Sequence, residues 1–124
     1  MAEILRHPRP NCIWDWWAVD AEGFIVQFSC GPAPESLLAH LDRVDAAAAW
    51  AEENLPTWFG SDPLPPLHAF DGDGELPTYT RRGVPVAPLR LSDAPVAIAD
   101  VAGLVRLRRA VGDAWTIYLD EGWI

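Results

Sequence analysis

Residues 13 to 31 read IWDWWAVDAEGFIVQFSCG, and this stretch predicts a β-hairpin around which the rest of the chain is organised. It holds three of the seven tryptophans and consists of two runs rich in aromatic and β-branched residues. The sequence DAEG at residues 20 to 23 separates these runs, and Gly23 can supply the positive φ that such a turn requires.

A two-residue loop of Ala21 and Glu22 would set the register of this hairpin. Core-face pairs would then be Val19 with Phe24, Trp17 with Val26, and Ile13 with Cys30, while Trp16 with Gln27 and Trp14 with Ser29 would share the opposite face. We therefore expect two groups of tryptophans, with Trp17, Trp50 and Trp115 in the core and Trp14, Trp16 and Trp58 more exposed. A face that mixes aromatic and polar groups is typical of a protein interface. The alternative is that the first helix covers this face.

Two helices are predicted after the hairpin. The first begins near Glu35 and Ser36 and runs to Pro56, with a possible break near residue 44. Its apolar stripe recurs at spacings of three and four residues, at Leu37, Leu41, Val44, Ala48, Ala51 and Leu55. The second has Ser92 or Asp93 as its cap, Pro95 in its first turn and Gly112 as its end, with an apolar face of Ile98, Val101, Leu104 and Val105.

The remaining segments predict a long loop and short strands. Residues 55 to 77 are rich in Pro, Gly and Asp and read as irregular, although their aromatic residues indicate contact with the core. Short extended pieces follow between Tyr79 and Leu91, where Pro85 and Pro88 favour the edge of a sheet. Alternation of Trp115, Ile117 and Leu119 with polar residues predicts a final strand. The expected fold is α+β, one domain over residues 1–124, with a small, mostly antiparallel sheet begun by the hairpin and covered on one face by two helices.

The charge of the chain restricts its partners. The 124 residues carry a net charge of −9, and all nine basic residues are arginines. Such a protein is repelled by nucleic acid and by anionic membranes and is attracted to basic partners. The start of the chain lacks the apolar region of a signal peptide, and no apolar run is long enough to span a membrane, so we expect a cytoplasmic protein.

The residue types that carry chemistry do not form a recognisable catalytic or metal-binding pattern. Cys12 and Cys30 fall on opposite faces in the predicted register, so two free thiols are expected. Residues 71 to 75, DGDGE, do not have the spacing of a calcium loop, and His7, His40 and His68 lack the spacing of a zinc site. A nucleophilic pair of Cys30 and His68 stays open as an alternative. We expect no cofactor, no metal and no enzymatic activity.

Five short segments of the chain resemble known proteins. The residues concerned are Trp17 to Asp20, Glu22-Gly23 and Phe28 with Gly31, followed by VPV at 84–86 and PLRL at 88–91. Together they resemble the small acidic bacterial immunity proteins of polymorphic toxin systems. The resemblance implies an inhibitor that binds and neutralises a cognate toxin, often a basic enzyme that acts on nucleic acid.

Charge and aromatic content together predict the contact residues of such an inhibitor. Acidic groups would accelerate association with a basic partner, and aromatic groups would supply most of the affinity. The predicted partner-binding residues are Trp14, Trp16, Trp58, Asp62, Asp71, Asp73 and Glu75. The alternatives are a small cytosolic enzyme, or an interaction protein that forms a homodimer through the exposed hairpin face.

Overall fold

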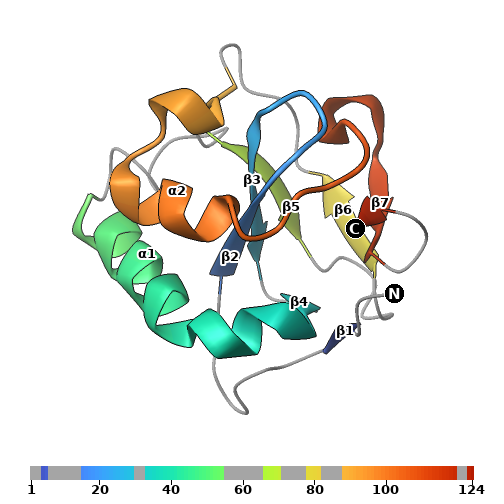
Figure 1. The fold of residues 1–124 in the computed structure, drawn as a ribbon. Coiled ribbons are helices and arrows are strands. Elements are labelled where there is room, and N and C mark those ends of the chain that lie inside the picture. Colours follow the sequence, from blue (N-terminus) through green and yellow to red (C-terminus); the bar gives the residue numbers. More distant parts are fainter. Residues whose placement is uncertain are drawn as a thin grey trace.

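A five-stranded sheet and two helices make up most of the fold (Figure 1). The computed structural model describes residues 4–5, 15–29, 33–54, 66–70, 78–81, 88–119 and 123–124. The strands are β1 (Ile4–Leu5), β2 (Asp15–Val19), β3 (Ile25–Ser29), β4 (Ala33–Pro34), β5 (Leu67–Phe70), β6 (Thr78–Arg81) and β7 (Thr116–Tyr118). The α-helices are α1 (Leu41–Glu53) and α2 (Val96–Ala102), and the 3-10 helices are η1 (Glu35–His40), η2 (Leu91–Asp93) and η3 (Val111–Asp113).

The main sheet has the strand order β2-β3-β5-β6-β7, whereas β1 and β4 form a separate short pair. Every neighbouring pair in the main sheet is antiparallel except β3 and β5, which are parallel. The predicted α+β class, with a mostly antiparallel sheet that begins with a hairpin, is therefore confirmed.

The hairpin is present, but its predicted register is wrong by one residue. Val19 pairs with Ile25, Trp17 with Gln27 and Trp16 with Phe28. The loop has three residues rather than two, and Asp20 and Phe24 face each other on either side of it. Gly23 is the last loop residue, and its φ of 85° makes this longer loop possible. The extra loop residue shifts every cross-strand partner by one position, so Gln27 faces Trp17 instead of Trp16, and Trp16 faces Phe28.

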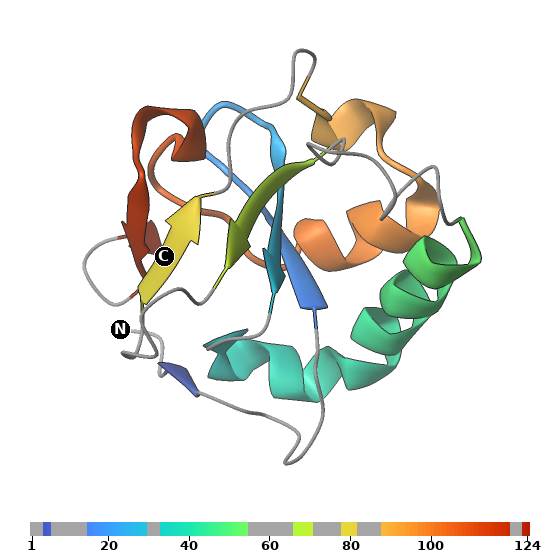
Figure 2. The ribbon, with the colours of Figure 1, turned by 180° about the vertical axis from the view of Figure 1, so that it is seen from behind.

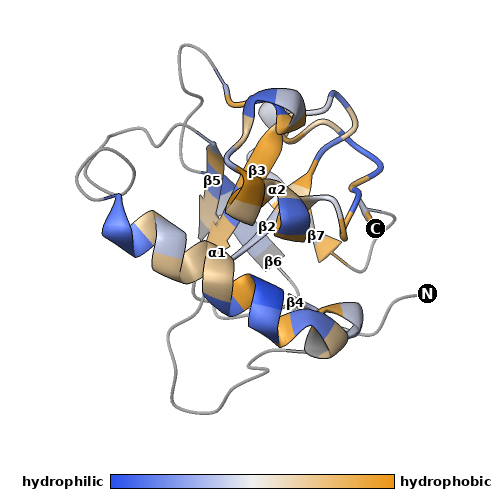
Figure 3. Cartoon of the chain, turned by 60° about the vertical axis from the view of Figure 1, so that its left-hand side comes forward, coloured by the Kyte–Doolittle hydropathy of each residue, from blue (hydrophilic) through white to orange (hydrophobic). Residues whose placement is uncertain are grey.

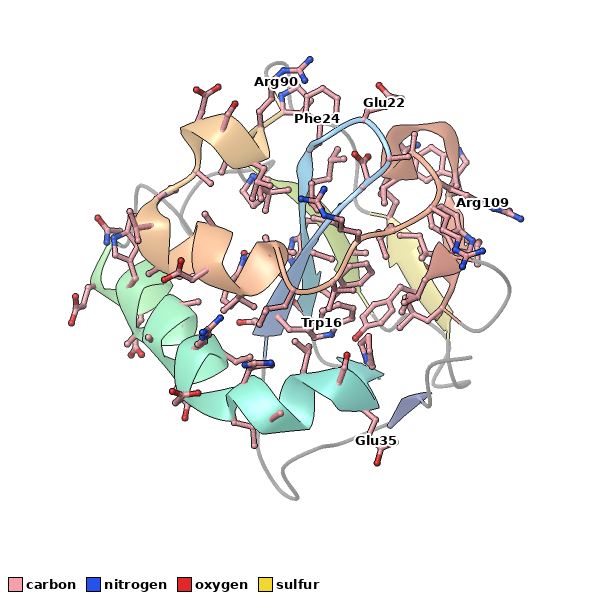
Figure 4. The ribbon with its side chains drawn as sticks, in the orientation of Figure 1. Trp16, Glu22, Phe24, Glu35, Arg90 and Arg109 are labelled. Carbon is pink, nitrogen blue, oxygen red and sulfur yellow. The ribbon has the colours of Figure 1, made fainter. Side chains whose placement is uncertain are left out.

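The main sheet curls around an aromatic cluster of Trp16, Phe28 and Tyr79. Trp16 stacks on Phe28 with ring centroids 4.2 Å apart, and its Nε1 donates a hydrogen bond of 3.2 Å to the Tyr79 hydroxyl. In a flat sheet β2 and β6 would lie about 14 Å apart, so this contact requires a concave face. In Figure 4, Trp16 lies on the side of β2 that faces β6, away from the two helices.

The two helices lie on the opposite side of β2 and β3 (Figures 1 and 3). The first helix forms over the predicted residues as η1 followed by α1, and it buries Leu37, Val44, Ala47 and Ala51. α2 packs against both α1 and β2. Because both faces of β3 are filled in this way, all five of its residues are buried.

The predicted extent of the second helix is wrong, since α2 ends at Ala102 rather than near Gly112. Beyond Gly103 the chain pairs with the free edge of β2. Val19 donates a backbone hydrogen bond of 3.0 Å to Val105, and Leu107 donates one of 2.8 Å back to Val19. The backbone N–H and C=O groups of these residues are thus satisfied more favourably by the open edge of β2 than by another helical turn.

The segment predicted to be an irregular loop contains β5, which lies in the middle of the sheet (Figure 2). β5 has only four residues, and Leu67 and Ala69 are buried. A strand buried on both faces need not alternate in polarity, and this one follows Pro65 and Pro66, so no periodic signal marked it. Of the extended pieces predicted between Tyr79 and Leu91, β6 lies between β5 and β7 and not at the sheet edge, while residues 82–87, with Pro85, lie outside the described residues.

Candidate functional sites

Of the seven predicted binding residues, the structure describes only Trp16. Trp16 is fully buried at 0% exposure, so the prediction that it lies on an exposed face is wrong. Phe28, which stacks on the Trp16 ring, and Tyr79, which meets it edge to face, account for this burial. The other predicted residues, Trp14, Trp58, Asp62, Asp71, Asp73 and Glu75, lie outside the described residues.

Two tryptophans expected in the core behave differently from each other. Trp17 is buried, and its Nε1 donates a hydrogen bond of 3.0 Å to Gln27 Oε1, so its predicted place is confirmed. Trp115 is 66% exposed, and the prediction for it is wrong. Trp115 lies directly before β7, whereas Ile117 in β7 and Leu119 directly after it are buried, as the alternation predicted.

A buried polar cluster joins β2, β3 and β5 through Asp15, Ser29 and His68. Ser29 Oγ and His68 Nε2 lie 2.8 Å apart, and the Ser29 side chain also hydrogen-bonds the Asp15 carboxylate. Burial raises the pKa of Asp15 above its usual 3.8, while the hydrogen bond from Ser29 acts in the opposite direction. The cluster contains the residue types of a nucleophilic site, so its geometry decides what it can do.

Burial argues against a serine that a substrate can reach. Which of Ser29 and His68 donates in their 2.8 Å contact depends on which ring nitrogen of His68 carries the proton. Ser29 is only 4% exposed and His68 only 8%. The cluster therefore connects three strands and offers no open position to a substrate.

The structure tests only part of the predictions about metal binding and free thiols. Within the described ranges, no group of three His, Cys, Asp or Glu side chains is placed to hold a metal ion. His40 and His68 lie on different elements, at the end of η1 and within β5. Cys12, Cys30, His7 and the 71–75 loop lie outside the described residues, so the free thiols and the Cys30–His68 pair stay predictions.

An acidic surface covers the outer side of α1, and sequence reasoning did not assign it a role. Asp42, Asp45, Glu52 and Glu53 are exposed on the side opposite Val44, Ala47 and Ala51, and Arg43 is the one basic residue of this helix. Figure 3 shows the hydrophilic residues near both ends of α1, with paler alanines between them. An amphipathic helix places such carboxylates on the side away from its apolar stripe, and this pattern indicates a surface without indicating what it binds.

Three arginines from the C-terminal half of the chain lie against aromatic rings. The Arg81 guanidinium lies 4.4 Å from the Trp115 ring centre, and Arg90 lies 4.6 Å from that of Phe24. Arg109 lies 5.6 Å from the ring centre of Trp123. Figure 4 places Arg90 above Phe24 at the tip of the hairpin and Arg109 on the side away from α1. Arg90 and Arg109 thus lie away from the acidic helix α1.

Comparison of the chain with protein-family models, with curated proteins and with solved structures found no match. The resemblance to immunity proteins therefore stays a prediction. Among the described residues, none of the helices has the length and apolar character needed to cross a membrane.

Proposed function

We propose that the protein is a non-catalytic binding domain, an immunity protein that neutralises a cognate bacterial toxin in the cytoplasm. The toxin would carry a basic surface, as enzymes that act on nucleic acid do. The observation that supports this proposal is the exposed acidic surface of α1, defined by Asp42, Asp45, Glu52 and Glu53. It replaces Trp16 as the described part of the contact surface, because Trp16 is buried.

The arrangement of this surface suits recognition by charge. The four carboxylates lie on one side of a single helix that is packed against α2 and β2, so the fold holds their backbone positions in place before binding. Preorganised charges raise the rate of association with an oppositely charged protein more than they lengthen the life of the complex. The predicted aromatic contact, Trp58, would instead control dissociation.

Binding kinetics against the product of the neighbouring gene test the proposal. The test variant combines Asp42→Asn, Asp45→Asn, Glu52→Gln and Glu53→Gln, and the matched control combines Asp93→Asn with Asp100→Asn, two exposed carboxylates on η2 and α2. We expect the test variant to associate about tenfold more slowly and with a weaker salt dependence, while the control associates like the wild type. Equal association rates for all three proteins would refute the role of α1.

The predicted residues outside the described ranges are tested in the same assay. Neutralising Asp71, Asp73 and Glu75 together should slow association further, and Trp58→Ala should speed dissociation, at a cost of roughly 2 kcal/mol. Substrate turnover that is lost on Cys30→Ala would replace the proposal with the enzyme alternative. Size-exclusion chromatography of the pure protein distinguishes the homodimer alternative.

A further inference from the structure

Three of the nine arginines, Arg106, Arg108 and Arg109, lie close together on the segment that follows α2, and all three are exposed. Val105 and Leu107, which alternate with them, are buried. Arg106 and Arg108 therefore project from the same outer side, as alternate residues of an extended segment do. These three residues, the arginine strip, concentrate positive charge on a chain whose net charge is −9.

Backbone hydrogen bonds to two other segments hold the arginine strip in place. Leu107 donates a hydrogen bond of 2.8 Å to the carbonyl of Val19 in β2, and Arg108 donates one of 2.7 Å to the carbonyl of Trp123. The backbone positions of the charges are thus fixed before a partner binds. Such preorganisation reduces the conformational entropy that binding would otherwise cost.

The arginine strip is not neutralised within the part of the chain that the structure describes. None of its three guanidinium groups forms an ion pair with a described carboxylate. Arg109 instead lies 5.6 Å from the ring centre of Trp123. Figure 4 places Arg109 on the side of the fold away from α1, so the acidic surface of that helix does not meet Arg109 within one molecule.

We infer that the arginine strip of one molecule binds the acidic surface of α1 on a second copy of this chain. Opposite charges on the two surfaces favour association and set the register of the contact. The spacings of the charges are also similar. Arg106 and Arg108, two positions apart on an extended segment, are separated by about 7 Å, and Asp42 and Asp45, three positions apart on a helix, by about 5–6 Å.

This contact joins two different surfaces, so the copies associate head to tail. Each pair leaves an arginine strip free at one end and an α1 surface free at the other, and such contacts either close into a ring or continue into a chain. Self-association would cover the surface that we propose for the toxin. The inference does not rest on that proposal, because its test uses this protein alone.

The salt dependence of self-association follows from the balance between local and net charge. The net charge of −9 on each copy opposes association over long distances. At about 0.15 M salt the screening distance is about 8 Å, so the contacting groups decide the outcome, whereas at about 0.01 M it is about 30 Å and the net repulsion acts. Association should therefore be strongest at intermediate salt and weaker at about 0.01 M and at about 1 M.

Translational diffusion of the full chain, measured by NMR over a series of protein concentrations, tests the inference. Exposed ion pairs each contribute little, so we expect a dissociation constant on the order of 1 mM for the wild type. The strip variant combines Arg106→Gln with Arg108→Gln and keeps Arg109 against Trp123. The α1 variant is the fourfold one described above. Each variant alone should have a dissociation constant about fivefold higher or more, while the control Arg90→Gln, at the exposed hairpin tip, should associate like the wild type.

Mixing the two variants gives the decisive result. The strip variant supplies an intact α1 surface and the α1 variant an intact arginine strip, so an equal mixture should form dimers with nearly the affinity of the wild type. A contact between two identical surfaces would not be restored by mixing. Circular dichroism checks that both variants are folded, since all their substitutions are at exposed positions.

Four results would overturn the inference. The first two are a wild type that stays monomeric at intermediate salt and a mixture that stays monomeric. The third is an α1 variant that associates more strongly than the wild type, because it carries four fewer negative charges and net repulsion alone predicts that result. The fourth is binding of a short oligothymidylate that is lost in the strip variant, which would assign the arginine strip to nucleic acid.

Discussion

Trp16 Nε1 donates a hydrogen bond to the hydroxyl of Tyr79, a residue that lies 63 positions later in the chain and three strands away in the sheet. Both side chains are fully buried, and Phe28 packs between them with its ring centre 4.2 Å from that of Trp16 and 4.7 Å from that of Tyr79. The curvature of the sheet is therefore held by one contact network on its concave face.

Tyr79→Phe should destabilise the fold by about 1–3 kcal/mol, because it leaves the indole N–H of Trp16 buried without an acceptor. Chemical denaturation checks the value. In the double variant with Trp16→Phe the donor is gone as well, so the two effects should not add. Additive losses would show that the hydrogen bond contributes little.

Asp20 connects the hairpin tip to the C-terminal segment. Its Oδ1 accepts hydrogen bonds from the backbone N–H groups of Glu22 and Phe24 at 2.9 and 3.0 Å, and its Oδ2 accepts one from Val111 at 3.0 Å. Asp20→Asn replaces one acceptor by a donor, which would face an N–H group. We expect a loss of about 2 kcal/mol in the free energy of unfolding, against less than about 0.5 kcal/mol for the exposed Asp93→Asn. A neutral Asp20→Asn would contradict this account.

Asp15 makes stability depend on pH. Burial raises its pKa in the folded state above the usual 3.8, so the folded state holds this proton more tightly than the unfolded state does. The contribution of Asp15 therefore favours folding at pH values below its unfolded pKa, and this contribution is lost as pH rises through the folded value. Asp15→Asn removes this loss, so its stability relative to wild type should be greater at about pH 7 than at about pH 3.

Urea unfolding of both proteins at the two pH values measures this difference. Ser29→Ala gives a second test, because it removes the hydrogen bond that lowers the pKa of Asp15 and should enlarge the loss. A stability difference between Asp15→Asn and wild type that is the same at both pH values would show that Asp15 titrates alike in the folded and unfolded chains.

Gly23 is the position in the hairpin loop where the backbone conformation requires glycine. Its φ is 85°, and a Cβ built there meets no atom within 4 Å, so the cost of a side chain is conformational and not steric crowding by neighbours. Gly23→Ala should lower the free energy of unfolding by about 1 kcal/mol. Gly112 has equally open surroundings without a positive φ, and Gly112→Ala should cost less. Equal losses for both would remove the conformational explanation.

The sequence by itself determined the elements that local patterns specify. Aromatic and β-branched runs around DAEG required a hairpin, and an apolar stripe at spacings of three and four from Leu37 to Ala51 required a helix. Charge composition also predicted an acidic surface, and the exposed carboxylates of α1 form one, while the acidic residues named for partner binding lie outside the described residues. These features depend on residues that are close together in the chain.

Only the tertiary structure decided which residues each face of the sheet contacts. One extra loop residue at Gly23 shifted the register, and the curled sheet placed Trp16 against Tyr79 from a distant strand. The strand β5 and the pairing of Val105 and Leu107 with Val19 exist because neighbouring strands supply their hydrogen bonds. The Arg81–Trp115 pair likewise depends on the alignment of β6 with β7. Contacts between residues far apart in sequence leave no local period, and for that physical reason the sequence did not reveal them.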